Sequence, residues 1–190
     1  KVLDWKSTIY NKLNDLGILT NNAKKGLGKG NLAYGTYRVE HNGQVLFEGS
    51  YVSMSGRKPT GGLLDNNTDM IDGSKIIPTN AERLDLGNPL SDRFFAPSLT
   101  SQALDSESKL IEFIFEEIRI SKGLDIPPGL TRSDMISSVS SDITINLNIV
   151  SEMTPCVSCA GILNDVESLF PPNSINVSGG TLFHNTPSVP

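Results

Sequence analysis

The chain has 190 residues, 37% hydrophobic and 19% charged, values typical of a globular protein with one full core and room for an appendage. Its net charge of −5 at pH 7 argues against broad neutralisation of duplex nucleic acid, although a local basic groove stays open. No run is long and apolar enough to span a bilayer, and two cysteines so close in sequence do not make a disulfide framework.

The N-terminal part predicts one helix followed by a loop. Residues 2–16 carry apolar side chains at helical spacing, namely Trp5, Ile9, Leu13 and Leu16. Gly17 is suited to end this helix. Residues 20–31, rich in Asn, Lys and Gly, predict a loop. This loop contains Lys24, Lys25 and Lys29, which could line a local basic groove or belong to a solvated flexible connector. We favour the connector. We therefore divide the chain into an N-terminal helix and linker, 1–30, and a main domain, 31–190.

A β-hairpin is predicted next. Residues 34–40 and 44–54 look like strands, and Asn42-Gly43 between them is a strong hairpin signal because both residues tolerate positive φ. From 55 to 99 the periodicity is lost, which indicates either missed elements or a functional lid. A short helix near 81–86 is one such element.

The second half predicts helix, strand, helix and strand. The clearest helix is 106–120, ended by Gly123, and the polar stretch 133–141 is expected to be irregular. Residues 143–150 alternate as a strand does, a helix starts near Cys156 and ends at Pro171-Pro172, and 175–178 predict a strand before a turn at Gly179-Gly180. A strand–helix–strand unit implies a parallel pair, so we expect an α/β fold: a three-layer α/β/α sandwich with a mixed sheet.

The only two cysteines, Cys156 and Cys159, form a Cys-x-x-Cys at the predicted start of a helix. Two thiols in that position suit half of a zinc site or a redox dithiol, because the helix N-terminus favours thiolates. The only histidines, His41 and His184, are expected to be ordinary surface residues.

A second acidic motif lies at the start of the clearest helix. Asp105 and Glu107 are two positions apart, so one carboxylate can hold a metal ion while the other points at what the metal binds. Helix capping is the competing interpretation, because Asp is favoured at the N-cap and Glu in the first turn.

Together the two motifs, D-S-E and P-C-V-S-C, resemble the H-x-E…P-C-x-x-C signature of the zinc-dependent, cytidine deaminase-like deaminases. The longer stretches 105–110 and 151–159 resemble bacterial polymorphic-toxin deaminases, in which an acidic residue can stand at the His position. The resemblance covers roughly Tyr34 to Gly180 and implies a cytidine deaminase-like fold for the main domain. The chain departs from the signature at Asp105.

The resemblance implies specific roles for these residues. Asp105, Cys156 and Cys159 would hold Zn²⁺, which lowers the pKa of a bound water. Glu107 would be the general base and then the general acid. The reaction would be hydrolytic deamination, first of all of cytosine to uracil in DNA or RNA, with adenine as an open choice.

The resemblance also implies partners and a location. The substrate would be single-stranded DNA or RNA, reached through a basic groove for which the candidates are Arg57, Lys58, Lys75 and Arg93. A cognate immunity protein would protect the producing cell. Toxin domains of this kind are the C-terminal tips of larger exported proteins, which agrees with a chain that starts at Lys1. The resemblance therefore implies the C-terminal part of a larger exported toxin, secreted or delivered into a target cell's cytoplasm.

Three alternatives stay open. A metabolic nucleoside or nucleotide deaminase would share the same site. A non-catalytic binding module would use the cysteines only as a stabilising zinc clip. A thioredoxin-type redox motif is a weaker choice, because it belongs near the start of a chain and this Cys-x-x-Cys lies near the end.

Overall fold

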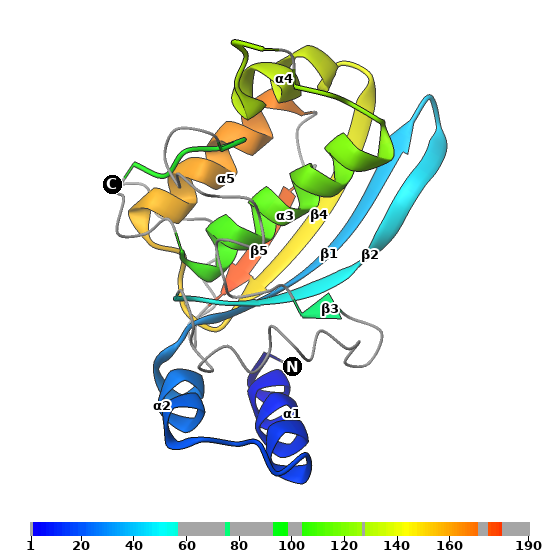
Figure 1. The fold of residues 1–190 in the computed structure, drawn as a ribbon. Helices are drawn as coiled ribbons and strands as arrows, with labels where there is room; N and C mark the ends of the chain where they lie inside the picture. Colours follow the sequence, from blue (N-terminus) through cyan, green and yellow to red (C-terminus); the bar gives the residue numbers. More distant parts are fainter. Residues whose placement is uncertain are drawn as a thin grey trace.

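The computed structural model describes residues 2–56, 75–76, 93–98, 104–126, 128–170 and 175–179. Within these ranges the chain forms five helices and one mixed sheet with strand order β3-β2-β1-β4-β5. In chain order the elements are α1 (Val2–Asp15), α2 (Asn21–Lys29), β1 (Leu32–His41), β2 (Gln44–Met54), β3 (Lys75–Ile76), α3 (Ser106–Ser121), α4 (Arg132–Val139), β4 (Ile143–Ser151), α5 (Val157–Leu169) and β5 (Ile175–Gly179). Helices α3 to α5 lie over the sheet, whereas α1 and α2 lie together at one end of it (Figure 1).

Strand β1 is the middle strand and pairs antiparallel with β2 on one side and with β4 on the other. The turn from β1 to β2 consists of Asn42 and Gly43, whose φ angles are 51° and 75°. Positive φ at both positions is what a tight Asn-Gly hairpin turn requires. The predicted hairpin is therefore confirmed.

The C-terminal half follows the predicted order of helix, strand, helix and strand. Helix α3 ends before Gly123, which has a positive φ of 62°. Strand β4 alternates strictly between buried and exposed residues. After α5, strand β5 pairs in parallel with β4, with Leu147 opposite Ile175. The parallel strand–helix–strand unit and the mixed sheet are confirmed.

The main core lies between the sheet and helices α3, α4 and α5. It contains Ala33, Tyr37 and Val39 of β1, and it is filled from α3 and α5 by Leu110, Ile111, Ile114, Phe115, Ile118, Ile162, Leu163 and Val166. Helix α3 packs very closely on β1 at Gly35, because a Cβ atom there would lie only 2.7 Å from Leu110 Cδ2. This close packing fixes the start of α3 beside the start of β1.

A second, smaller core lies on the opposite face of the sheet. It joins α1 and α2 to the start of β1 and the end of β2 through Ile9, Leu13, Leu27, Leu32, Val52 and Met54. Leu32 belongs to this core and its neighbour Ala33 to the main one, as expected for successive residues of a strand. Helices thus lie on both faces, but the second layer covers one end only: Arg38, Thr144 and Asn146 on that face are exposed.

Two predicted loops are helices. The prediction of a loop at 20–31 is wrong, because this segment contains helix α2. Thr20 caps the helix by accepting a hydrogen bond from the Ala23 N–H at 3.2 Å, and Ala23 and Leu27 are buried. The prediction of irregular structure at 133–141 is also wrong, because Thr131 and Asp134 form a capping box that starts α4. In both segments a local cap and two buried apolar residues outweigh the polar composition.

Several predictions lie outside the described residues. They are the short helix at 81–86, the stop at Pro171-Pro172, the turn residue Gly180, His184, Arg57 and Lys58, and the side chains of Trp5 and Lys75. Among the helices that the structure does describe, none has the length and apolar character needed to cross a membrane.

Candidate metal centre

The centre lies where the N-termini of α3 and α5 meet. Asp105 is the N-cap residue of α3, and Cys156 is the N-cap residue of α5. Asp105 Oδ2 lies 3.4 Å from Cys156 Sγ and 3.6 Å from Cys159 Sγ. Packing of α3 and α5 on the same side of the sheet therefore brings together residues 51 positions apart.

The three side chains form a group that could hold a metal ion. One ligand atom from each of Asp105, Cys156 and Cys159 lies within 4.8 Å of the others. Both thiols are free, with Cys159 buried and the other two residues half-buried. Two sulfurs and one carboxylate oxygen are accepted zinc ligands, and three protein ligands leave a fourth position for water or substrate. The donor set thus fits zinc.

The side chain of Asp105 does not act as a helix cap. Its backbone has the extended conformation typical of an N-cap residue, with φ −67° and ψ 151°, but the carboxylate makes no capping hydrogen bond. It contacts the two sulfurs instead. In α5 the cap is the sulfur itself, since Cys156 Sγ accepts a hydrogen bond from the Cys159 N–H at 3.3 Å. The capping interpretation of Asp105 is therefore not supported by its contacts.

The electrostatics of Cys159 indicate what a cation would change. Burial first, and then the negative charge of Glu107, raise the pKa of the Cys159 thiol above its ordinary value. A cation bound at the sulfur acts in the opposite sense, because it stabilises the thiolate. Metal binding at this group should therefore release a proton.

Glu107 lies in the first turn of α3 beside the sulfurs and is only 2% exposed. Its Oε2 accepts a hydrogen bond from Ser106 Oγ at 2.9 Å and lies 3.8 Å from Cys159 Sγ. Its Oε1 accepts from Ser151 Oγ at 2.6 Å and from Asn31 Nδ2 at 3.0 Å. One oxygen is thus held by β4 and the segment before β1, while the other faces the thiols.

Asn31 is a site residue that the sequence analysis missed. Its Nδ2 lies 3.0 Å from Ser106 Oγ and 2.9 Å from Ser151 Oγ, in addition to Glu107. Its Oδ1 accepts a hydrogen bond from the Met153 N–H at 3.1 Å. Asn31 therefore joins the start of β1 to the starts of α3 and of the loop before α5. A single amide in an Asn- and Gly-rich stretch gave no sequence signal for this role.

Arg93 does not belong to an exposed basic groove, so that part of the prediction is wrong. The side chain is buried, and Nη1 donates a hydrogen bond to Ser108 Oγ on α3 at 2.7 Å. His41 is half-buried at the opposite end of β1 from Asn31, where its Nε2 lies 3.3 Å from Asn42 Nδ2. It takes no part in the centre.

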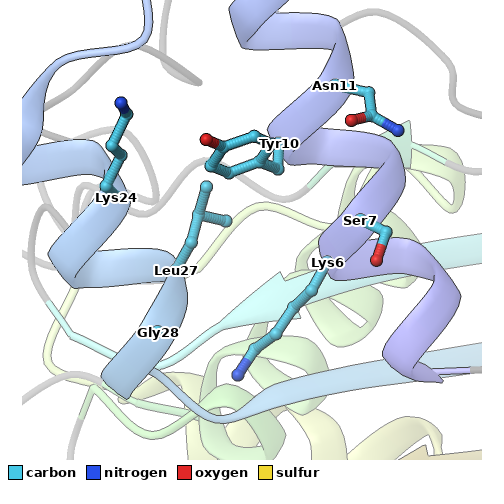
Figure 2. A pocket seen from close by; sticks show the side chains of 7 residues that line it. All are labelled: Lys6, Ser7, Tyr10, Asn11, Lys24, Leu27 and Gly28. Carbon is cyan, nitrogen blue, oxygen red and sulfur yellow. The ribbon is translucent and has the colours of Figure 1, made fainter.

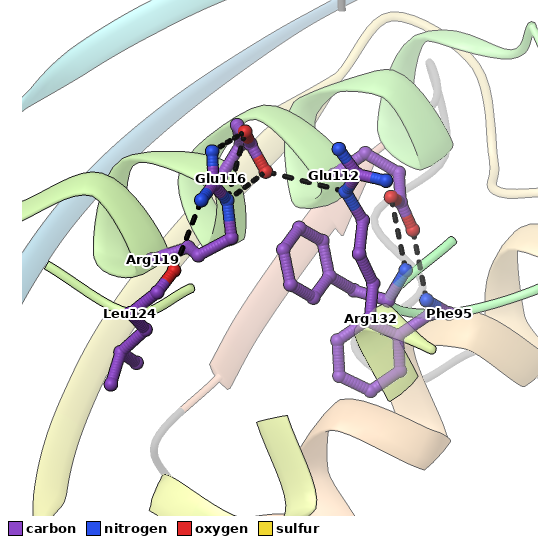
Figure 3. A network of polar contacts seen from close by, with 7 residues as sticks. Phe95, Glu112, Glu116, Arg119, Leu124 and Arg132 are labelled. Atoms are coloured by element: carbon purple, nitrogen blue, oxygen red, sulfur yellow. Dashed lines mark hydrogen bonds and ion pairs between the residues drawn. The ribbon is translucent and has the colours of Figure 1, made fainter. Parts of the chain in front are cut away.

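A network of polar contacts further along α3 ties the segment at 93–98 and helix α4 to this helix (Figure 3). The Glu112 carboxylate accepts hydrogen bonds from the N–H groups of Phe94 and Phe95 at 3.1 and 2.8 Å. Burial raises the pKa of Glu112 to about 7, although these two hydrogen bonds and the nearby Arg93 act against the shift. One turn further along α3, Glu116 pairs with Arg119 and with Arg132 of α4.

Comparison of the chain with protein-family models, with curated proteins and with solved structures gave no significant match. The described residues thus show a possible metal site, without a matching family to assign its function.

Proposed function

We propose that the protein is a zinc-dependent hydrolytic deaminase of nucleobases, acting first of all on cytosine in DNA or RNA. The observation that carries this proposal is the arrangement of Asp105, whose carboxylate faces two thiols instead of capping its own helix, with Glu107 Oε2 beside them. Three metal ligands next to a buried carboxylate are what the resemblance to cytidine deaminase-like enzymes implies. The hairpin, helix, strand, helix order also agrees with it.

The residues would divide the work as follows. Asp105, Cys156 and Cys159 would hold the zinc ion, which in such a ligand set lowers the pKa of a water molecule to near neutrality. Glu107 would accept a proton from the water at Oε2, the oxygen nearer Cys159, and pass it to the ring nitrogen; it would then transfer a second proton, from the new hydroxyl group on the ring, to the leaving amine. In the net reaction one water replaces the exocyclic amine of the base, which leaves as ammonia.

Asn31 and Ser151 would position the carboxylate of Glu107. Both hydrogen-bond Oε1, so rotation of the carboxylate would break two short contacts. A buried, held carboxylate keeps its reacting oxygen directed at one place, which is a requirement for efficient proton transfer.

As the C-terminal part of an exported toxin, such a domain would act on nucleic acid inside a target cell, and the producer would need an immunity protein.

A second candidate function has its own supporting observation. Glu107 is 2% exposed and accepts hydrogen bonds from three side chains, which also suits a purely structural carboxylate. The protein would then be a non-catalytic binding module stabilised by a zinc clip. A metabolic nucleoside deaminase remains the enzymatic alternative, because it would use the same centre.

The test is base conversion by purified, zinc-loaded protein. Single-stranded DNA, single-stranded RNA and free cytidine are incubated with wild type, with Glu107→Gln and with Glu167→Gln, an exposed α5 glutamate that serves as the matched control. We expect conversion by wild type and by the control, and a loss of about 10²–10⁴-fold in Glu107→Gln, because a general acid/base contributes that much.

Zinc content and thermal unfolding are measured on the same samples. Full activity in a folded, zinc-loaded Glu107→Gln variant would exclude the general acid/base role. Stoichiometric zinc with no conversion of any base by wild type would favour the zinc-clip module.

A further inference from the structure

An open groove of about 370 Å³ lies between α1 and α2, within the roughly 300–1,000 Å³ range of pockets that hold small molecules. It is lined by Lys6, Ser7, Tyr10, Asn11, Lys24, Leu27 and Gly28. Tyr10 of α1 and Lys24 of α2 stand on the two walls, and Lys6 lies nearer the other end (Figure 2). The Tyr10 side chain is 39% exposed, and none of the lining residues is acidic.

The charge of this part of the chain is opposite to that of the rest. Residues 1–30 contain six lysines and two aspartates, a net charge of +4, whereas residues 31–190 contain ten basic and nineteen acidic residues. Helix α2 contains three lysines and no acidic residue. A basic segment in an otherwise acidic protein is the electrostatic footprint of a polyanion-binding surface.

Two connections, each through a neighbouring residue of the chain, relate the groove to the residues around the candidate centre. Lys6 Nζ, at the groove, pairs with Glu152 Oε2 at 2.6 Å, and Glu152 directly follows Ser151, which holds Glu107. On the other wall, α2 leads through Gly30 into Asn31, which also holds Glu107. The groove and the residues that position the proposed general base therefore lie at the same end of β1, with α1 and α2 packed on the opposite face of the sheet from α3 and α5.

We infer that this groove binds the sugar-phosphate backbone and one flanking base of a single-stranded nucleic acid whose neighbouring base enters the centre. The inference rests on the proposed function and narrows its substrate class to a polymer. Lys6 is already paired with Glu152, so Lys24 is the groove lysine that can pair with a phosphate, and the exposed Tyr10 ring provides a stacking surface for a base. A free nucleoside has no phosphate for Lys24 and no second base for Tyr10.

The test is the binding of fluorescein-labelled single-stranded DNA and RNA of equal length, followed by fluorescence anisotropy at several salt concentrations. Lys24→Gln is compared with Lys25→Gln. Lys25 is the next residue of α2 and is exposed like Lys24, but it does not line the groove. Tyr10→Phe is compared with Tyr10→Ala to separate the ring from the hydroxyl. Thermal unfolding confirms that each variant is folded.

We expect Lys24→Gln to weaken binding severalfold. The slope of log K against the logarithm of salt concentration should become less steep by about 0.7, because one phosphate contact is lost. Lys25→Gln should leave both values near those of wild type, and Tyr10→Ala should weaken binding whereas Tyr10→Phe should not. Equal effects of the two lysine variants, or no binding of either oligonucleotide by folded wild type, would overturn the inference.

The same samples separate this inference from the proposed function. Groove-dependent binding without conversion of any base would contradict the deaminase proposal and leave the groove as a nucleic-acid site. Conversion of free cytidine by a protein that binds no oligonucleotide would support a deaminase and contradict the groove.

Discussion

Asp105 shows why a helix-start motif is ambiguous when read from sequence. An aspartate at the N-cap normally accepts a hydrogen bond from the first turn, so its presence there needs no further explanation. Here the carboxylate makes no such bond and lies within 3.6 Å of both sulfurs. The direction of the side chain decides between the two roles, and it depends on where α5 packs, which the local sequence does not contain.

Asp105→Asn separates ligation from capping. Asparagine caps helices as well as aspartate does, so a capping role predicts unchanged stability without metal. As a metal ligand, the neutral amide is poorer than a carboxylate, and we expect zinc affinity to fall by at least the roughly 10–100-fold that even outer-shell changes cost. Competition with a fluorescent zinc chelator measures this affinity, with Asp165→Asn, at an exposed position of α5, as the control. Unchanged zinc affinity in Asp105→Asn would remove Asp105 from the ligand set.

At the scale of elements, the sequence predicted well wherever a local signal agreed with the final packing. The Asn42-Gly43 turn, the apolar face of α3 and the alternation of β4 are such signals. The helices α2 and α4 were missed because each has, among its described side chains, only two buried apolar residues amid polar ones. The Thr131–Asp134 capping box of α4 was present in the sequence and outweighed its composition.

The role of Asn31 could not be predicted for a different reason. Its partners Ser106 and Ser151 lie 75 and 120 positions away, so nothing local marks it. The Asp105 and Cys-x-x-Cys motifs were recognised because each has an internal spacing. The approach of the two motifs to each other required the fold.

Glu112 of α3 gives a pH-dependent contribution to stability. Its pKa is raised to about 7 in the folded protein, mainly by burial, whereas the unfolded chain has the ordinary value of 4.5. Between these two values the folded protein retains a proton that the unfolded chain has released, so stability falls as the pH rises from 4.5 to 7. The contribution is fully present below pH 4.5 and lost above pH 7.

Urea unfolding of wild type and Glu112→Gln at pH 5 and pH 8 measures this contribution. We expect the free energy of unfolding of wild type, taken relative to the variant, to decrease between the two pH values, because glutamine does not titrate. Other titrating groups, including the cysteines, are common to both proteins and cancel in the difference. A difference that stays constant would show that Glu112 titrates normally.

The whole molecule combines an acidic body with a basic N-terminal part. The main core places α3 and α5 so that their N-termini meet, while the second core attaches α1 and α2 to the start of β1 and the end of β2 on the opposite face of the sheet. The candidate metal centre and the groove between α1 and α2 thus lie at the same end of β1. The sequence shows that basic residues are concentrated in 1–30, but only the fold places Lys6 and Lys24 on the two helices that line one groove.

X-ray absorption at the zinc edge on purified wild-type protein tests the metal centre most directly, because it reports the atoms around the metal. We predict one zinc ion per chain, with two sulfur ligands at zinc–sulfur distances of about 2.3 Å. The remaining ligands should be oxygen or nitrogen atoms at about 2.0–2.2 Å from the zinc. Asp105→Asn should change the oxygen shell and Cys156→Ala should remove one sulfur. A protein without zinc, or a zinc ion surrounded by oxygen and nitrogen only, would contradict the assignment of Asp105, Cys156 and Cys159 as its ligands.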